Sequence, residues 1–446
     1  MGTLVGSGYV NNNNNKNNNN YRVRAVSAMQ PVIYDIPFSS IVEAYRDCLK
    51  NKRGTNSYTK FTMSYEGQLV WLWERIKTRT YKPGYSYTFI VDYPVTREIF
   101  AASFIDRVVH HYIALRIEPI LDTLFVEQGN VSKNCRKGEG NMKMVQEVAQ
   151  ILREVSEDYT TDAYIFKGDV ANFFMSIDKS ILWEMIDDFV REEYKGDDLD
   201  CLLYLLNEVI FHCPQDRCIR KSPINKWQPL PKRKSLFYTE RNRGMAIGNL
   251  PSQLLANFFA SAFDQWLKYN GVDYYRRFCD DFVIVTKDKD MLLQLIPQME
   301  KYLDEQLKMS LHPDKRYIQH YTKGVKMVGT VIKPGRIYVA NRTIGKFYEK
   351  IRYYNTLADE GLQEQYVEKF VQSINSYYGI MKHYNTYNIR KRIGNDMILP
   401  KWAGYLYFCK GWSKAKVVRK YKPIYKTRKS YQCGKVSFAP ELGKRK

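Results

Sequence analysis

The chain has 446 residues, of which 44% are hydrophobic, enough for a sizeable core and two or three substructures. Its 69 Lys and Arg residues outnumber its 47 Asp and Glu residues, and the formal net charge of +22 favours a polyanionic partner. No apolar run reaches the roughly 20 residues of a membrane helix, and residues 1–30 lack the apolar stretch of a signal peptide, so we expect a cytoplasmic protein without membrane segments.

The amino-terminal part combines a polar tail with helical patterns. Residues 11–20 hold nine asparagines. So polar a segment cannot bury enough surface to fold, and we expect a disordered tail over residues 1–29. Residues 30–168 are predicted to be mainly helical with some strand, and the apolar spacing around Trp71 and Trp73 predicts a buried helical face.

Aspartates end two apolar strands in the middle of the chain. Residues 165–178 (IFKGDVANFFMSID) place Asp169 at the end of a short strand, and residues 276–285 (RRFCDDFVIV) predict a hairpin with Asp280 and Asp281 at its tip. Carboxylates this close repel one another unless a cation lies among them, and their hard oxygens suit Mg²⁺. An Asp-Asp pair alone is more often structural, in a turn or helix cap, so the interpretation depends on the neighbouring segments.

Seven segments, taken in order, resemble motifs of the reverse transcriptase family, and the resemblance covers most of residues 60–400. Two of them carry the aspartates, which match the family's three catalytic aspartates, with Cys279 where a small or aromatic residue is more usual. The other five segments are REIFAASFIDRVVHH (97–111), GNVSKNCRKGEGN (129–141), GMAIGNLPSQLLANFF (244–259), LKMSLHPDKR (307–316) and VKMVGTVIKPGR (325–336).

This resemblance implies an α+β fold, the right-hand polymerase fold. We expect fingers over residues 30–168, a palm with an antiparallel sheet backed by helices over 169–335, and a helical thumb over 336–410. Residues 213–243 are basic and Pro-rich, and are predicted to form an insertion or loop beside a nucleic-acid channel. Residues 411–446 are predicted to be a basic tail that stays mobile until it binds RNA or protein.

The resemblance also implies the site residues. Two Mg²⁺ ions would activate a 3′ hydroxyl and stabilise the departing pyrophosphate. Their predicted ligands are Asp169, Val170, Asp280 and Asp281, all but Val170 being the catalytic aspartates. Asp280 is favoured over Asp281 as a ligand because successive side chains on a strand point to opposite faces. The predicted nucleotide-binding residues are Arg97, Phe174, Ile247, Gly248, Gln253 and Lys315. Arg136 and Lys137 are predicted to contact RNA phosphates, with ordinary solvated charges as the alternative.

Several of these residues have predicted roles. Phe174 stands five residues after Asp169, where reverse transcriptases place an aromatic gate that excludes a 2′-hydroxyl. Gly248 would let the backbone approach a base pair. Lys315 occupies a position proposed to aid pyrophosphate departure, and a plain surface lysine is the alternative.

Within the family, the pattern Ile247-Gly248-Asn249 followed by Ser252-Gln253 resembles the reverse transcriptases of diversity-generating retroelements. Group II intron enzymes have a glutamine where Ile247 stands. Isoleucine offers no donor or acceptor, so we expect weaker discrimination between correct and incorrect pairs and misincorporation opposite template adenines. The alternative is that Ile247 is simply a packing residue.

The subclass implies further expectations. The partners are template RNA, cDNA and deoxynucleotides, and a pentameric basic accessory protein that binds the polymerase. The asparagine-rich tail is either an ordinary disordered tail or a template repeat translated in frame, with Met29 as the natural start. The rival functions are a higher-fidelity retron-like or defence-associated reverse transcriptase and a noncatalytic RNA-binding scaffold.

The eight cysteines form no CxxC pair, which gives little support to a zinc site. Cys213 and Cys218, near His212, form the one close cluster in the sequence. We interpret them as reduced thiols, with metal binding as the alternative.

Overall fold

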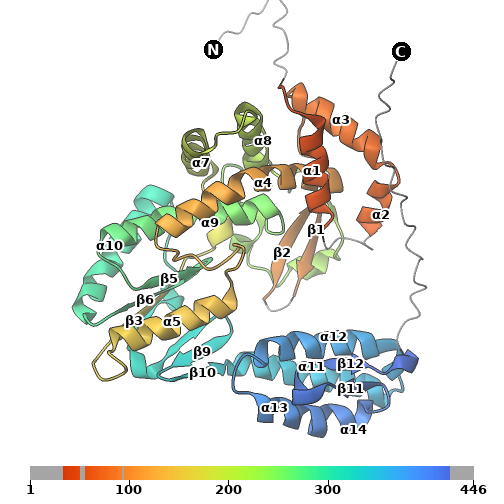
Figure 1. Cartoon of the computed structure of the whole chain (residues 1–446), viewed down its shortest axis with the longest axis vertical. Coiled ribbons are helices and arrows are strands. Elements are labelled where there is room, and N and C mark those ends of the chain that lie inside the picture. Colours follow the sequence, from red (N-terminus) through yellow and green to blue (C-terminus); the bar gives the residue numbers. More distant parts are fainter. Residues whose placement is uncertain (1–33, 51–55, 93–94, 422–446) are drawn as a thin grey trace, which may run out of the picture.

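A four-stranded antiparallel sheet, which we call the central sheet, forms the framework of the middle part of the chain in the computed structural model, which describes residues 34–50, 56–92 and 95–421 (Figure 1). Its strand order is β5-β6-β3-β7. The strands are β3 (Tyr164–Asp169), β5 (Tyr275–Phe278), β6 (Asp281–Thr286) and β7 (Tyr317–His320). The predicted strand before Asp169 and the predicted hairpin at Asp280 are therefore both present.

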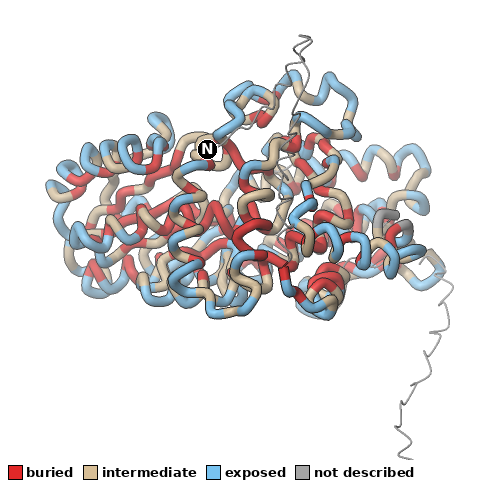
Figure 2. The backbone as a smooth tube through the Cα atoms, turned by 90° about the horizontal axis from the view of Figure 1, so that it is seen from above, coloured by how far each residue is buried: buried red, intermediate tan, exposed pale blue. Residues whose placement is uncertain are grey.

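Alternation along the strands explains how helices cover both faces of this sheet. Phe166 and Phe282 point to one face, where they join the core formed with α9 (Leu250–Tyr269) and α10 (Lys289–Leu307). Ile165 and Val283 point to the other face and pack with α5 (Asn141–Val155). In Figure 2, buried segments run through the middle of the molecule and exposed ones lie at its periphery.

The amino-terminal part is built around one long helix, α4 (Phe104–Glu127), whose N-cap Ser103 accepts a hydrogen bond from the Asp106 N–H. The surrounding elements are α1 (Phe38–Cys48), α2 (Asn56–Thr62), α3 (Tyr65–Lys77), α7 (Lys179–Glu193), α8 (Leu199–Phe211) and the hairpin of β1 (Ser86–Val91) and β2 (Arg97–Ala102). The prediction for Trp71 is wrong, because its side chain on α3 is 48% exposed and stacks under the Arg75 guanidinium. Trp73 is half-buried, and its indole N–H donates to the Ile36 carbonyl.

Residues 213–243, predicted to form an insertion or loop, are held in place by bonds to distant strands. Their strand β4 (Cys218–Arg220) pairs in parallel with β1, and three short 3₁₀ helices follow at Ile224–Trp227, Lys232–Lys234 and Leu236–Tyr238. The buried Glu98 carboxylate on β2 accepts bonds from the Ser235 hydroxyl and the Leu236 N–H, each 2.8 Å. A carboxylate from a distant strand thus organises the segment, which its local pattern could not reveal.

A small sheet joins the central part to the carboxy-terminal helices. It is a meander of β8 (Val325–Met327), β9 (Thr330–Lys333) and β10 (Arg336–Val339). The predicted boundary between residues 335 and 336 therefore falls inside one sheet, between two hydrogen-bonded strands. The helices begin at α11.

The carboxy-terminal unit has its own core, centred on the fully buried Trp402. It consists of α11 (Asn341–Asp359), α12 (Gln363–Met381), α13 (Tyr387–Arg392), a π-helix (Ile393–Ile398), α14 (Leu399–Trp402) and the hairpin of β11 (Leu406–Phe408) and β12 (Ala415–Val417). Residues 411–421 were predicted to be mobile, and this is wrong. Asn375 bonds both backbone groups of Ala415, donating to its carbonyl at 3.0 Å and accepting from its N–H at 2.8 Å.

The remaining terminal predictions lie outside the described residues, namely the tail over 1–29 and residues 422–446. Among the described helices, none is long and apolar enough to span a bilayer.

Candidate active site at the end of the central sheet

Strand register brings the three predicted aspartates together at one end of the sheet. Asp169, the last residue of β3, is the cross-strand partner of Asp281, the first residue of β6. Phe278 pairs with Asp281, so Cys279 and Asp280 form a two-residue hairpin loop. The Val170 N–H donates to the Asp280 carbonyl at 3.0 Å, which ties the hairpin tip to the end of β3.

Two lysines already neutralise two of these carboxylates. The Lys315 Nζ lies 3.0 Å from both carboxylate oxygens of Asp169, whose residue is only 5% exposed. The Lys167 Nζ lies 3.2 Å from Asp281 Oδ1. The structure therefore places Lys315 inside the carboxylate cluster and not on an isolated surface.

Asp280 has a large pKa shift within this cluster of carboxyl groups. Burial, then the neighbouring carboxylates of Asp169 and Asp281, raises the pKa of Asp280 to about 6. Burial also raises the pKa of Asp281, and Lys167 opposes this shift. A carboxyl group with a raised pKa among other carboxyl groups is stabilised when a cation joins it.

The donor set fits a magnesium ion that is completed by substrate. Across the described ranges, no three His, Cys, Asp or Glu side chains form a metal-binding group by themselves. Mg²⁺, however, typically uses one or two carboxylates and takes its other ligands from phosphates and water. Asp169 and Asp280 provide such a pair. Cys213 and Cys218 are both free thiols, and metal binding there stays an untested alternative.

The glycine segment packs against β2. Gly248 has φ +118°, and a Cβ there would lie 2.7 Å from Ile99 Cγ2. Phe100 N–H donates to the Ile247 carbonyl at 2.9 Å, and Asn249 Oδ1 accepts from the Ala102 N–H. Glycine is therefore required at 248 by its positive φ and by its close approach to the Ile99 side chain and the Phe100 carbonyl of β2. Its approach to a base pair stays a prediction.

Phe174 and Ile247 share one surface. Phe174 lies in α6 (Phe173–Ser176), and its carbonyl accepts from the Met245 N–H at 2.8 Å. Both side chains are half-buried at the edge of the small cluster that contains Phe100. Phe173, by contrast, is buried in the main core.

The other predicted contact residues lie in different settings. Arg97 is exposed at the start of β2. Gln253 is exposed on α9 and accepts a weak bond from Cys135 Sγ at 3.8 Å. The structure does not bring Arg97 into the carboxylate cluster through any bond among the described residues.

The two predicted RNA contacts differ sharply. Arg136 is nearly buried, and its guanidinium pairs with Asp122 at 2.7 Å and donates to Asn130 and to the Ser132 carbonyl. It braces its own loop, and a phosphate contact would require it to leave these partners. The Lys137 side chain is 84% exposed, with a single ion pair to Glu118, and remains accessible to RNA.

Lys167 is a site residue that sequence reasoning missed. It lies two positions before Asp169 on β3, so both side chains share a face of the sheet. That period-two spacing was the signal that would have found it.

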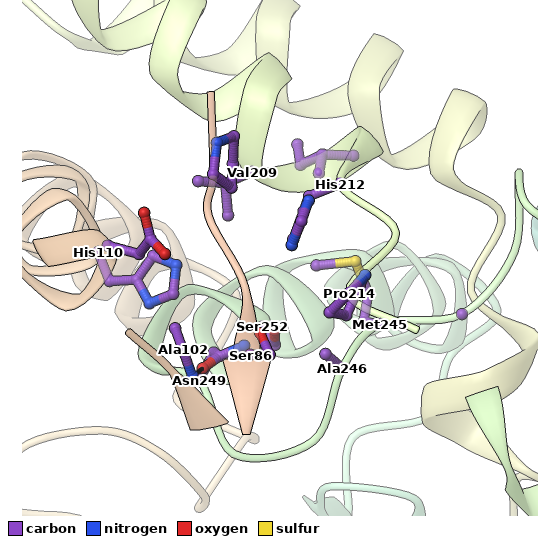
Figure 3. Close-up of a pocket in the computed structure, with 14 residues that line it drawn as sticks. Ser86, Ala102, His110, Val209, His212, Pro214, Met245, Ala246, Asn249 and Ser252 are labelled. Carbon is purple, nitrogen blue, oxygen red and sulfur yellow. Dashed lines mark hydrogen bonds between the residues drawn. The ribbon is translucent and has the colours of Figure 1, made fainter. Parts of the chain in front are cut away.

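A small cavity lies behind the glycine segment (Figure 3). His110 and Asp106 of α4, His212 after α8, and Asn249 and Ser252 line it. Burial lowers the pKa of His110 to about 3, so this imidazole is neutral. The cavity measures about 20 Å³, roughly the space of one water molecule. It is too small for a nucleotide, and the carboxylate cluster is the better candidate site.

Comparisons with known proteins do not assign a function to this chain. No protein-family model matches the sequence, and no curated protein matches it either. Among solved structures, apo telomerase from Candida tropicalis is similar over 70% of this chain and 61% of that one, with 12% identity and a TM-score of 0.43. Its form truncated from the C-terminal domain is similar over 57% and 54%, with 14% identity and a TM-score of 0.41.

Telomerase from Candida albicans in complex with a TWJ fragment of telomeric RNA is similar over 72% of this chain and 61% of that one, with 12% identity and a TM-score of 0.39. This chain thus covers between 54% and 61% of the length of these structures.

Proposed function

We propose that this chain is an RNA-directed DNA polymerase of the diversity-generating retroelement type, which makes error-prone cDNA from a retroelement template RNA. One observation carries the proposal. Asp169 and Asp281 are direct cross-strand partners, and Asp280 lies on the adjoining turn with a pKa raised to about 6. Three acidic residues from two distant parts of the chain thus lie together at one end of the sheet, which supports the proposal of a two-metal nucleotidyl transferase.

The chain's own residues would perform distinct tasks. Asp169 and Asp280 would hold Mg²⁺, together with Val170 and with Asp281 in a supporting role. When bound, the two ions supply Lewis-acid stabilisation of the attacking and departing oxygens. Lys315 is half-exposed and ion-paired with Asp169. The Lys315 ammonium, if released from Asp169, would bind the phosphates of the pyrophosphate product.

Substrate selection would use the surface beside the carboxylates. Phe174 would exclude a 2′-hydroxyl, and Ile247 and Gln253 would contact the nascent pair, with Gly248 keeping this segment against β2. Ile247 has no polar group with which to brace a correct pair, so discrimination would be weak. Arg97 and Lys137 would contact the triphosphate and the template backbone respectively.

The ion pairs are the observation that favours the rival, a noncatalytic RNA-binding scaffold. Lys315 and Lys167 neutralise Asp169 and Asp281 without any divalent cation. In a scaffold, these pairs would be permanent structural bonds. In an enzyme, they would yield to Mg²⁺ and substrate.

Primer extension on a defined RNA with deoxynucleotides and Mg²⁺ separates the two readings. We expect the wild-type protein to extend the primer and Asp280→Asn to abolish extension while RNA binding is unchanged. The matched control is Asp273→Asn, which removes an exposed carboxylate just before β5. Full extension by Asp280→Asn, or none by the wild-type protein, would overturn the proposal.

A further inference from the structure

The hairpin loop that carries Asp280 has an unusual backbone. Cys279 has φ +60°, the left-handed region that residues other than glycine adopt at a cost. Such a conformation persists only where its surroundings hold it. The loop has just two residues, so any relaxation at Cys279 would move Asp280 directly.

Both polar groups of Cys279 are held by buried side chains. Its N–H donates to Asn134 Oδ1 at 2.7 Å, and its carbonyl accepts from Arg277 Nη1 at 3.2 Å. Arg277 is itself fixed by a two-pronged ion pair with Asp264, in which both side chains are 1% exposed. The turn is therefore held by Arg277 of the preceding strand and by Asn134 of a second, distant segment.

The second segment is the loop between α4 and α5, and it is anchored beside β5. The Lys133 N–H donates to the Arg277 carbonyl at 2.9 Å, and the Arg277 N–H donates to the Val131 carbonyl at 3.0 Å. Ser132 Oγ donates to Asn257 Oδ1 at 2.6 Å. Residues 131–134 thus run along β5 like a short parallel edge strand, which leaves Asn134, 5% exposed, facing the turn.

We infer that Asn134 is a positioning residue, which fixes the Cys279–Asp280 turn beside Asp169 and thereby sets the affinity of the site for a divalent cation. The inference rests on the proposed function. Asn134 does not contact the reacting atoms. It acts through a single hydrogen bond to backbone, and an amide oxygen serves there because it accepts without adding a fourth negative charge to the cluster.

Direct cation binding tests the inference without relying on activity. Mn²⁺ would be titrated into full-length protein, without RNA or nucleotide, and free Mn²⁺ followed by electron paramagnetic resonance. We expect Asn134→Ala to weaken Mn²⁺ binding about tenfold, as loss of a residue that orients a metal ligand commonly does. RNA affinity and the KM for deoxynucleotide should change little, while kcat falls.

Three variants make the result specific. Asp273→Asn removes an exposed carboxylate just before β5 and leaves the loop at 131–134 and the Cys279 bond in place, so it should retain wild-type Mn²⁺ affinity. Asn134→Asp keeps an acceptor of the same shape and should bind Mn²⁺ at least as tightly as the wild type. If Asn134→Ala does not fold, Asn134→Ser, too short to reach the Cys279 N–H, takes its place with the same expectation.

The outcomes distinguish a failure of this inference from a failure of the proposed function. Equal Mn²⁺ affinity for Asn134→Ala and Asp273→Asn, in a protein that binds Mn²⁺ through Asp280 and extends primers, would refute the positioning role alone. If the wild-type protein binds no Mn²⁺ that Asp280→Asn removes, the proposed function fails and the inference fails with it.

Discussion

Two acidic side chains lie near one short strand, β5, and they differ in whether their charge is paired. Asp264 on α9 bonds both Arg277 and the Tyr275 hydroxyl and is 3% exposed. Asp280, in the turn after β5, has no ion pair within the described part of the chain, and its pKa is raised to about 6. We expect removal of the paired carboxylate to destabilise the fold and removal of the unpaired one to relieve repulsion.

The largest expected effect on stability comes from removing Asp264, the ion-paired carboxylate. Asp264→Ala would leave the Arg277 guanidinium buried without its partner, and we expect a loss of about 3–5 kcal/mol in the free energy of unfolding. Urea unfolding followed by circular dichroism measures it. Exposed Asp290→Ala serves as the control. A loss below about 1 kcal/mol would show that the two sites do not differ as described.

Asp280→Asn should do the reverse and stabilise the metal-free protein. The folded-state pKa of Asp280 lies above the ordinary value of 3.8, so the wild type loses stability as pH rises from about 4 to about 6 and keeps that penalty above it. Removing the charge should recover on the order of 1–3 kcal/mol at pH 7.5. Urea unfolding in EDTA at pH 5 and 7.5 should show a smaller gain at pH 5. A destabilised variant at pH 7.5 would contradict the raised pKa.

The same pKa predicts the pH dependence of synthesis. Only the ionised Asp280 can hold a cation, so the single-turnover rate should fall about tenfold for each pH unit below about 6. More Mg²⁺ should move the midpoint to lower pH, because cation binding competes with the proton. Rates measured from pH 5 to 8 at two Mg²⁺ concentrations test this. A midpoint that ignores Mg²⁺ would mean that another group titrates.

The smallest expected effect concerns fidelity. Ile247→Gln adds an amide beside the proposed nucleotide site and should lower misincorporation opposite template adenine by several-fold, with about 1.4 kcal/mol of regained discrimination for each tenfold. Sequencing cDNA made from a defined RNA gives the substitution spectrum. Ile247→Leu is the matched apolar control and should keep the wild-type spectrum. Equal spectra for all three proteins would leave Ile247 as a packing residue.

Local patterns predicted the elements that depend on local chemistry. Apolar alternation identified β3 and the β5–β6 hairpin. The site residues that no pattern revealed act across the fold. Asn134 reaches Cys279 from a loop far away in sequence, and nothing in the residues around Asn134 indicates that contact.

Two segments show the limits of composition. Residues 213–243 and 411–421 are rich in Pro, Gly or charge, and in each a distant side chain bonds the backbone. For the first it is Glu98, and for the second Asn375. Composition describes what a segment prefers alone, and a single buried hydrogen-bonding partner can override it.

The two hydrogen bonds between Asn375 and Ala415 limit how far the carboxy-terminal end can be shortened. A chain that ends after residue 421 would keep all the described residues that pack in the core around Trp402. A stop after residue 410, where composition alone would cut, would remove β12 and leave β11 and the Asn375 amide without partners. Truncated proteins intended for crystals or assays should therefore retain residue 421, and material that ends earlier should precipitate.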